Sequence, residues 1–219
     1  MKQKRLFIIL STILIILCIS NTKLHYDVFN LHKHHIVKQP KYSYAYDCIK
    51  EAELQYWEYK YQLSNEIQNY INSVAPSSNV RAYALIEECE KYNVDIKFVL
   101  AQAEIESHFG TKGIGSRLNN VFNIGVFDNL TEETVKSSYK YTYPNESIEP
   151  YLKLITSKYL VNKTEMDLMH NYIDINGNRY ASDKYYEAKL RDKYHHISTS
   201  TKIDNLQNMV KSYAIKCNR

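Results

Sequence analysis

The chain has 219 residues, of which 44% are hydrophobic and 24% are charged, which suits one medium-sized domain with an extension. Only 5 glycines and 4 prolines argue against a protein built from many short strands and tight turns. The net charge of +4 includes Lys2, Lys4 and Arg5, and without these three the chain carries 25 basic and 24 acidic residues, so no broad basic excess indicates a nucleic-acid partner.

The first twenty residues differ from the rest of the chain. After the basic start, residues 6–20 form a continuous apolar run. An apolar region of about 7–15 residues is typical of a secretory signal, and a full transmembrane helix needs about 20. We therefore expect residues 1–20 to be a signal peptide or a membrane anchor. Because the basic cluster stays inside, either function would place the rest of the chain outside the cytoplasm.

Residues 21–45 lack a sustained hydrophobic period and contain Pro40, so we interpret them as a linker. The sequence HKHH at 32–35 has no accompanying Cys or carboxylate pattern, and we favour a solvated cluster over a metal site. Outside the apolar run the cysteines are Cys48, Cys89 and Cys217, which leaves open either one disulfide or buried free thiols.

Residues 46–71 are predicted to be helical, because apolar residues recur there at mostly three- and four-residue steps. The segment 46–73 is either a spacer or an N-terminal extension packed on the following domain. The sequence APSSN at 75–79 then breaks the helix, and the domain itself is expected over residues 74–219.

Two helices are predicted next. Asn79 is a candidate N-cap for a helix that runs to residue 92, and Asp95 is the N-cap of the next helix, over 96–109. Gly110 closes that second helix as a residue able to adopt positive φ. Its apolar stripe consists of Phe98, Ala101, Ile105 and Phe109.

The helix over 96–109 carries two acids, Glu104 and Glu106, in an otherwise apolar stretch. Positions i and i+2 of a helix lie about 200° apart, so the two acids cannot share a face. Glu106 borders the apolar stripe one turn after the small Ala103, where partial loss of solvent would raise its pKa towards that of a general acid. Glu104, with Lys97 and His108 near it on the helix, is interpreted as a solvated or ion-paired surface charge.

Four segments, in order, resemble one family. AQAEIESHFGT at 101–111 closely resembles the AQAxxESxxG helix of bacterial cell-wall glucosaminidases, which are glycoside hydrolases of family 73 with a lysozyme-like fold. NNVFNIG at 119–125, YKYTYPNESIEPYLKLI at 139–155 and RYASDKYYEAKL at 179–190 resemble the segments that follow in that family. The resemblance covers roughly residues 80–215. It implies a mainly α, lysozyme-like helical domain, with room for a small β or loop lobe.

The resemblance also implies roles for individual residues. Glu106 matches the general acid that protonates the glycosidic oxygen, and Tyr180 matches a tyrosine that lines the cleft and assists at the anomeric centre. The residues expected to shape the cleft or bind substrate are Asn120, Phe122, Asn123, Tyr141 and Tyr143. The sequence departs from the family pattern at His108 and Phe109, which replace a small residue and a Trp, and at Asn123, which replaces a common Gly.

A second catalytic group is less evident. Glycosidases usually pair their acid with a base or nucleophile. Glu132 and Glu133 are the candidates, in a polar segment where the family often has a mobile lobe over the cleft. The alternative is assistance by the N-acetyl group of the substrate, with Tyr180 in support.

These features predict a peptidoglycan hydrolase that cleaves the β-1,4 bond between N-acetylglucosamine and N-acetylmuramic acid. No metal or organic cofactor is implied, and the expected partner is the peptidoglycan glycan strand. The protein would be secreted, periplasmic or anchored through residues 6–20 to the membrane, facing the cell wall. The alternatives are a lytic transglycosylase or lysozyme-type muramidase, and a catalytically inactive, membrane-tethered wall-binding protein.

Overall fold

The computed structural model describes residues 44–127 and 130–217, with the side chains of residues 50–127 and 130–216. The signal or anchor segment, the HKHH cluster and the side chains of Cys48 and Cys217 lie outside this described part, and the domain boundaries stay predictions. Among the described residues, no helix is both long and apolar enough to cross a membrane.

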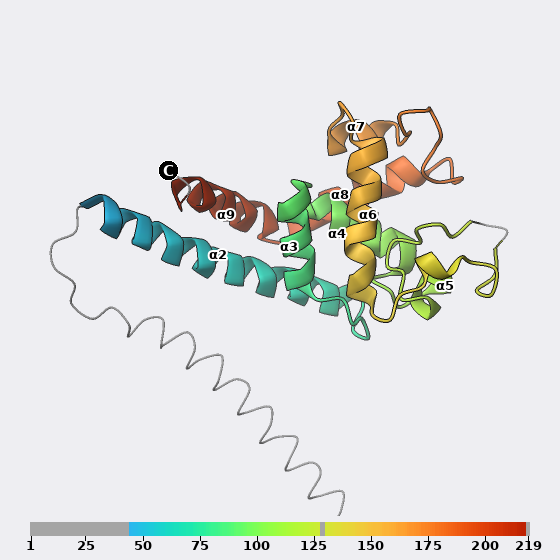
Figure 1. Ribbon diagram of the computed structural model, residues 1–219, viewed down its shortest axis with the longest axis horizontal. Helices are drawn as coiled ribbons and strands as arrows, with labels where there is room; N and C mark the ends of the chain where they lie inside the picture. Colours follow the sequence, from blue (N-terminus) through green and yellow to red (C-terminus); the bar gives the residue numbers. More distant parts are fainter. Residues whose placement is uncertain (1–43, 128–129, 218–219) are drawn as a thin grey trace, which may run out of the picture. The chain divides into compact units, whose positions relative to one another are not determined.

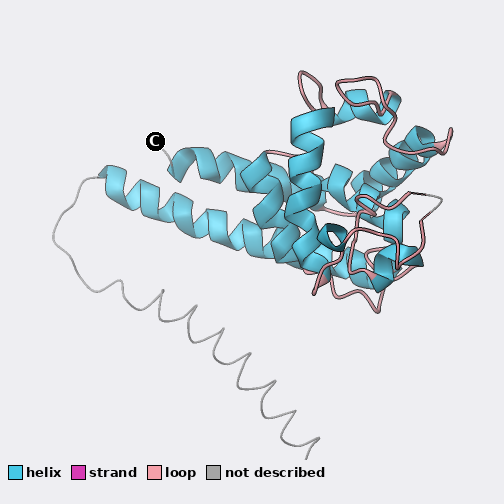
Figure 2. Cartoon of the chain, turned by 45° about the vertical axis from the view of Figure 1, so that its right-hand side comes forward, coloured by secondary structure: helices cyan, strands magenta, loops and turns pink. Residues whose placement is uncertain are grey.

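Helices account for nearly all of the regular structure (Figures 1 and 2). The α-helices are α2 (Tyr44–Val74), α3 (Ala82–Tyr92), α4 (Ile96–Ser107), α5 (Gly113–Arg117), α6 (Ile148–Leu154), α7 (Glu165–His170), α8 (Tyr186–Ser200) and α9 (Ile203–Cys217). Two 3-10 turns, η1 (Ser137–Tyr139) and η2 (Pro144–Ser147), precede α6, and the π turn η3 (Ile155–Tyr159) follows it. The strand-like pairing in the described residues is one isolated bridge, Ile173 to Arg179. The predicted mainly α fold class is therefore confirmed, and the lobe between α5 and α6 consists of loops and turns.

Helix α2 spans the predicted helix with a few more residues at each end. Its second half is part of the main core, where Leu63, Ile67 and Ile71 are buried. The buried Lys60 forms ion pairs with Glu87 and Glu90 of α3. Figure 1 shows α3 and α9 beside α2. Thus α2 packs on the helices that follow it in the chain.

The start of α3 differs from the prediction. Asn79 is not the N-cap, because the helix begins at Ala82 and its N-cap Arg81 makes no side-chain cap hydrogen bond. The free N–H groups are instead satisfied from elsewhere: Asn145 Oδ1 accepts from the Arg81 N–H at 2.9 Å, and Gln68 Oε1 accepts from the Ala82 N–H at 3.0 Å. Side chains far away in the sequence therefore take the place of a local N-cap side chain.

Helix α4 starts as predicted and ends earlier than predicted. The Asp95 side chain accepts a hydrogen bond from the Lys97 N–H at 2.9 Å, which confirms it as the N-cap. At the other end, His108 adopts φ 53°, and Phe109 and Gly110 also have positive φ, so the helix closes at Ser107. Glu106 therefore lies in the last turn of the helix.

Helix α4 is the central helix of the core and packs most extensively against α8. It is buried around most of its circumference, not along one stripe, and the buried set includes the polar residues Lys97, Gln102 and Glu104. Other elements pack on α4 from several sides, and for this reason the helix lacks a polar face.

Candidate active site

Glu106 is held by two neutral hydrogen-bond donors. The Tyr186 hydroxyl, at the first residue of α8, donates to Glu106 Oε1 at 2.5 Å. The Asn123 amide donates to Oε2 at 3.2 Å and also to the Glu106 backbone carbonyl at 2.5 Å. The end of α4, the start of α8 and the loop after α5 therefore meet at one carboxyl group.

The surroundings of Glu106 favour its protonated form. Burial raises the pKa of Glu106, and the hydrogen bonds from Tyr186 and Asn123 lower it in part, with a net rise. The C-terminal end of a helix carries partial negative charge, which also disfavours a carboxylate there. Burial, and then the nearby carboxylate, raise the pKa of Tyr186 as well, so its hydroxyl keeps its proton and remains a donor.

An open hollow of about 320 Å³ lies beside this carboxyl. It is lined by Glu104, Ile105, Glu106, Ser107 and His108 at the end of α4 and by Lys112 and Gly113 at the start of α5. A general acid requires solvent-accessible space beside its carboxyl group in order to reach a substrate oxygen.

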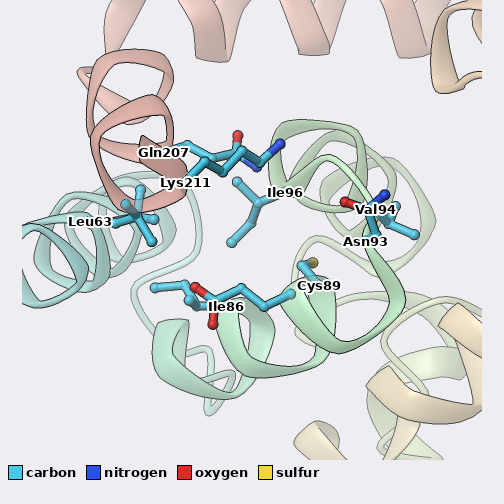
Figure 3. Close-up of a pocket in the computed structure, with 10 residues that line it drawn as sticks. Leu63, Ile86, Cys89, Asn93, Val94, Ile96, Gln207 and Lys211 are labelled. Atoms are coloured by element: carbon cyan, nitrogen blue, oxygen red, sulfur yellow. The ribbon is translucent and has the colours of Figure 1, made fainter. Parts of the chain in front are cut away.

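A second, smaller cavity of about 40 Å³ lies elsewhere, among α2, α3, the turn before α4 and α9 (Figure 3). Its wall is mainly apolar and includes Leu63, Ile86 and Ile96. The volume is close to that of one water molecule, which is too small for a sugar. The Cys89 thiol in its wall is free and buried, and burial raises its pKa, so for this cysteine the free-thiol interpretation holds.

Tyr180 lies next to Tyr186 and contacts the loop that carries Asn123. Its hydroxyl donates to the Phe122 carbonyl at 3.2 Å. Its ring stacks on Tyr172 with centroids 4.6 Å apart and lies 5.7 Å from the ring of Tyr186. The structure thus brings the predicted Tyr180 close to the site, but the tyrosine that touches the acid is Tyr186.

Tyr186 was missed from the sequence although it lies in the quoted segment 179–190. Its signal was helical spacing: Tyr186, Leu190 and Ile197 form one buried face of α8. The family pattern drew attention to Tyr180, in the loop before this helix.

Asn120 and Phe122 are buried supports of the loop that carries Asn123. The Asn120 amide donates to the carbonyls of Ile124 at 2.9 Å and Tyr139 at 3.1 Å. The Phe122 ring stacks on Tyr151 with centroids 3.8 Å apart. Neither side chain lines the hollow beside Glu106. Their contacts hold the loop in place, and their role in shaping the cleft stays a prediction.

Asn123 occupies a position that suits glycine. Its φ is 49°, in the left-handed region that Asn tolerates better than most residues. A Cβ on Gly115 would lie 2.5 Å from Asn123 Oδ1, so the glycine in α5 leaves the space that this side chain occupies. Ser107 fixes the same loop to α4, because its hydroxyl donates to the Val121 carbonyl at 2.6 Å.

The two remaining predicted tyrosines, Tyr141 and Tyr143, differ in burial. The Tyr141 hydroxyl is buried and has no hydrogen-bond partner among the described residues, and burial raises its pKa. Tyr143 is 65% exposed at the start of η2. Neither makes a hydrogen bond to Glu106.

Glu132 and Glu133 lie on the loop between α5 and η1. Glu132 forms an ion pair with Arg117 Nε at 2.7 Å, which fixes its part of the loop to α5. Glu133 is exposed, and a hydrogen bond from Thr131 holds its pKa below the usual range. Neither carboxylate contacts Glu106. Among the described residues, no three His, Cys, Asp or Glu side chains gather as metal ligands.

Glu104 is not the surface charge that the sequence predicted, since only 7% of it is exposed. The Tyr70 hydroxyl of α2 donates to Oε2 at 2.5 Å, and Lys193 of α8 forms an ion pair with Oε1. The ion-paired part of the interpretation was right, but with Lys193 and not a neighbour on α4. Both partners are far away in sequence, so the local pattern gave no sign of them.

One comparison with known proteins identifies a family. A family model described as mannosyl-glycoprotein endo-beta-N-acetylglucosaminidase matches residues 82–199, which is more than half of the chain. The matched segment contains Glu106, Asn123, Tyr180 and Tyr186 and begins after α2. A comparison with curated proteins found no match.

Proposed function

The chain belongs to the glucosaminidase family and is a glycoside hydrolase, and on this premise we propose that it cleaves the β-1,4 bond after N-acetylglucosamine in peptidoglycan. The observation that carries the proposal is the Glu106 carboxyl, with its raised pKa, beside an open hollow in the matched segment. A carboxyl that keeps its proton can donate it to the leaving oxygen of a glycosidic bond.

In the proposed mechanism Glu106 protonates the glycosidic oxygen as the bond to the anomeric carbon breaks. The acid then becomes a carboxylate. Tyr186 and Asn123 already donate to its two oxygens, so they stabilise the negative charge as it develops, without rearrangement. The Tyr180 ring lies 5.7 Å from the ring of Tyr186 and, in the proposal, lines the cleft near the anomeric centre.

The second catalytic step has two proposed routes. In the first, Glu132 or Glu133 moves in with its loop and activates water, which gives inversion at the anomeric carbon. Glu132 pairs with Arg117 at the end of α5, so this route requires that ion pair to break if Glu132 is the group that moves. In the second, the N-acetyl oxygen of the substrate attacks the anomeric carbon as the leaving sugar departs, with Tyr180 in support. Water then opens the cyclic intermediate at the anomeric carbon, which gives retention. Proton NMR of the first-formed product anomer distinguishes the two.

The proposal includes a location outside the cytoplasmic membrane, where peptidoglycan lies. Residues 1–20 would provide export as a signal peptide, or tethering as an anchor through residues 6–20. Immunodetection in culture supernatant, periplasm and membrane fractions tests this part of the proposal, which cytoplasmic protein alone would refute.

The main test is mass spectrometry of peptidoglycan digested with the purified protein. Fragments with N-acetylglucosamine at the reducing end support the proposal. Anhydro-muramic ends would indicate a lytic transglycosylase, and muramic reducing ends a muramidase. No release of fragments, where a control hydrolase is active, would favour a wall-binding protein.

A zymogram then assigns the acid. Glu106→Gln keeps the shape of the side chain and removes the proton, so no clearing is expected. Glu58→Gln, at an exposed acid of α2, is the matched control and should clear like the wild type. Equal clearing by wild type and Glu106→Gln would refute the assignment.

A further inference from the structure

Helix α2 contacts the catalytic helix directly, although it lies before the segment that the family model matches. Tyr70, near its C-terminal end, is buried, and its hydroxyl donates to the Glu104 carboxylate at 2.5 Å. The Tyr70 ring also lies edge-on to Phe109, which follows the end of α4, with centroids 6.2 Å apart. The extension therefore reaches within two residues of Glu106 along α4.

Glu104 itself joins three helices. It belongs to α4, accepts from Tyr70 of α2 and pairs with Lys193 of α8. A buried carboxylate is costly unless it is paired and hydrogen-bonded, so this geometry is strongly preferred over any other in which Glu104 loses a partner. The last turn of α4 is consequently fixed in its rotation.

Two side chains of helix α8 contact the acids in the C-terminal part of α4. Tyr186 donates to Glu106 and Lys193 pairs with Glu104. Tyr186 and Lys193 are seven residues apart, which is two helical turns or about 10.5 Å along the axis. Because Glu104 and Glu106 point to different sides of α4, the two contacts together set both the spacing of the helices and the rotation of α4.

We propose that Tyr70, Glu104 and Lys193 are positioning residues that hold the Glu106 carboxyl against Tyr186, so that α2 contributes to the active centre from outside the matched segment. The inference rests on the proposed function, in which Glu106 is the acid. Loss of the cluster lets the last turn of α4 rotate. Small displacements of a catalytic group reduce the rate of the chemical step more than they reduce substrate binding.

The first test compares two tyrosines that make the same kind of bond. Tyr194 of α8 donates to Asp95 Oδ2 at 2.6 Å, at the N-cap of α4, so Tyr194→Phe is the matched control for Tyr70→Phe. Each variant loses one tyrosine–carboxylate bond to α4, at opposite ends of the helix. We expect Tyr70→Phe to lower kcat about tenfold with KM little changed, and Tyr194→Phe to keep the wild-type kcat. Equal kcat for the two variants would overturn the proposal.

The pH profile gives an independent readout. A looser contact between Tyr186 and Glu106 removes stabilisation of the carboxylate, which raises the pKa of Glu106. The fall in kcat/KM at high pH should therefore move to higher pH in Tyr70→Phe and stay in place in Tyr194→Phe. An unchanged profile in both variants would contradict a positioning role.

Lys193 provides a conservative rescue. Lys193→Arg keeps a cation for Glu104 and should keep kcat within about twofold, whereas Lys193→Met should lower kcat about tenfold at a temperature where both are folded. Equal kcat for the two folded variants would argue against the proposal. If Lys193→Met does not fold, the Tyr70→Phe comparison decides, since it removes a single hydroxyl.

Glu106→Gln distinguishes failure of the proposed function from failure of the positioning role. If Glu106→Gln hydrolyses peptidoglycan like the wild type, the proposed function and the positioning role both fail. If Glu106→Gln is inactive while Tyr70→Phe and Tyr194→Phe behave alike, the positioning role alone fails.

Discussion

The two sides of α4 show how one residue type serves two purposes. Glu104 is buried and has a lysine and a tyrosine as partners. Glu106, two residues later, has only neutral donors as hydrogen-bond partners in the described structure, and burial raises its pKa. The partners differ in charge: Lys193 is a cation beside the buried Glu104, whereas Glu106 is buried with neutral donors, and burial favours its protonated form.

Removing the Glu106 carboxyl should have the largest effect. Glu106→Gln is expected to lower kcat/KM for soluble peptidoglycan fragments about 10³-fold, within the range that a general acid contributes. The measurement is the release of reducing ends. Glu104→Gln should lower kcat/KM far less, because it still accepts a hydrogen bond from Tyr70. A larger loss in Glu104→Gln than in Glu106→Gln would reverse the comparison.

Removing the cation that pairs with Glu104 should lower stability in addition to kcat. Lys193→Met leaves the Glu104 carboxylate buried with Tyr70 alone, and the free energy of unfolding should fall by about 2 kcal/mol. Lys189→Met breaks an exposed ion pair with Asp183 on the same helix and should cost about 0.5 kcal/mol. Urea unfolding measures both. Similar losses in the two variants would mean that burial of Glu104 has no energetic consequence.

Tyr186→Phe removes the donor to Glu106 Oε1. That hydrogen bond stabilises the charged form, so its loss raises the pKa of Glu106, and the fall in kcat/KM at high pH should move upward. We also expect kcat to drop about tenfold, because the developing carboxylate loses a donor. Tyr194→Phe is the control, since its hydroxyl donates to Asp95 at the other end of α4. A shift of the profile to lower pH would contradict this prediction.

Asn123→Gly should have the smallest effect. Glycine adopts the positive φ of this position without strain, so the change removes the amide and not the backbone geometry. Loss of the donor to Oε2 raises the pKa of Glu106 in the same direction as Tyr186→Phe. Because that hydrogen bond is 3.2 Å long, we expect a smaller shift and about a threefold fall in kcat. The same pH titration of kcat/KM measures it, and a shift larger than in Tyr186→Phe would contradict the ranking.

Local patterns were enough for several features of the fold and the site. Helical spacing predicted α2, the Asp95 cap and the separation of Glu104 from Glu106, because each depends on residues a few positions apart. The placement of Glu106 beside an apolar stripe also predicted the direction of its pKa shift.

The features that sequence reasoning missed depend on partners far away in the chain. Glu104 is buried because Tyr70 and Lys193, 34 and 89 residues away, supply its hydrogen bonds. The N–H groups at the start of α3 find Asn145 and Gln68 for the same reason. A single sequence without tertiary contacts gives no sign of such pairs.

The buried half of α2 bears on where the catalytic unit should be taken to begin. Leu63, Ile67 and Ile71 fill one side of the core, and Tyr70 reaches the helix that carries the acid. A fragment cut at residue 82, where the family match starts, would expose that side to water and lose a partner of Glu104. Recombinant work on this hydrolase should therefore start upstream of Lys60, so that the core side of α2 stays covered and Glu104 keeps Tyr70 as a partner.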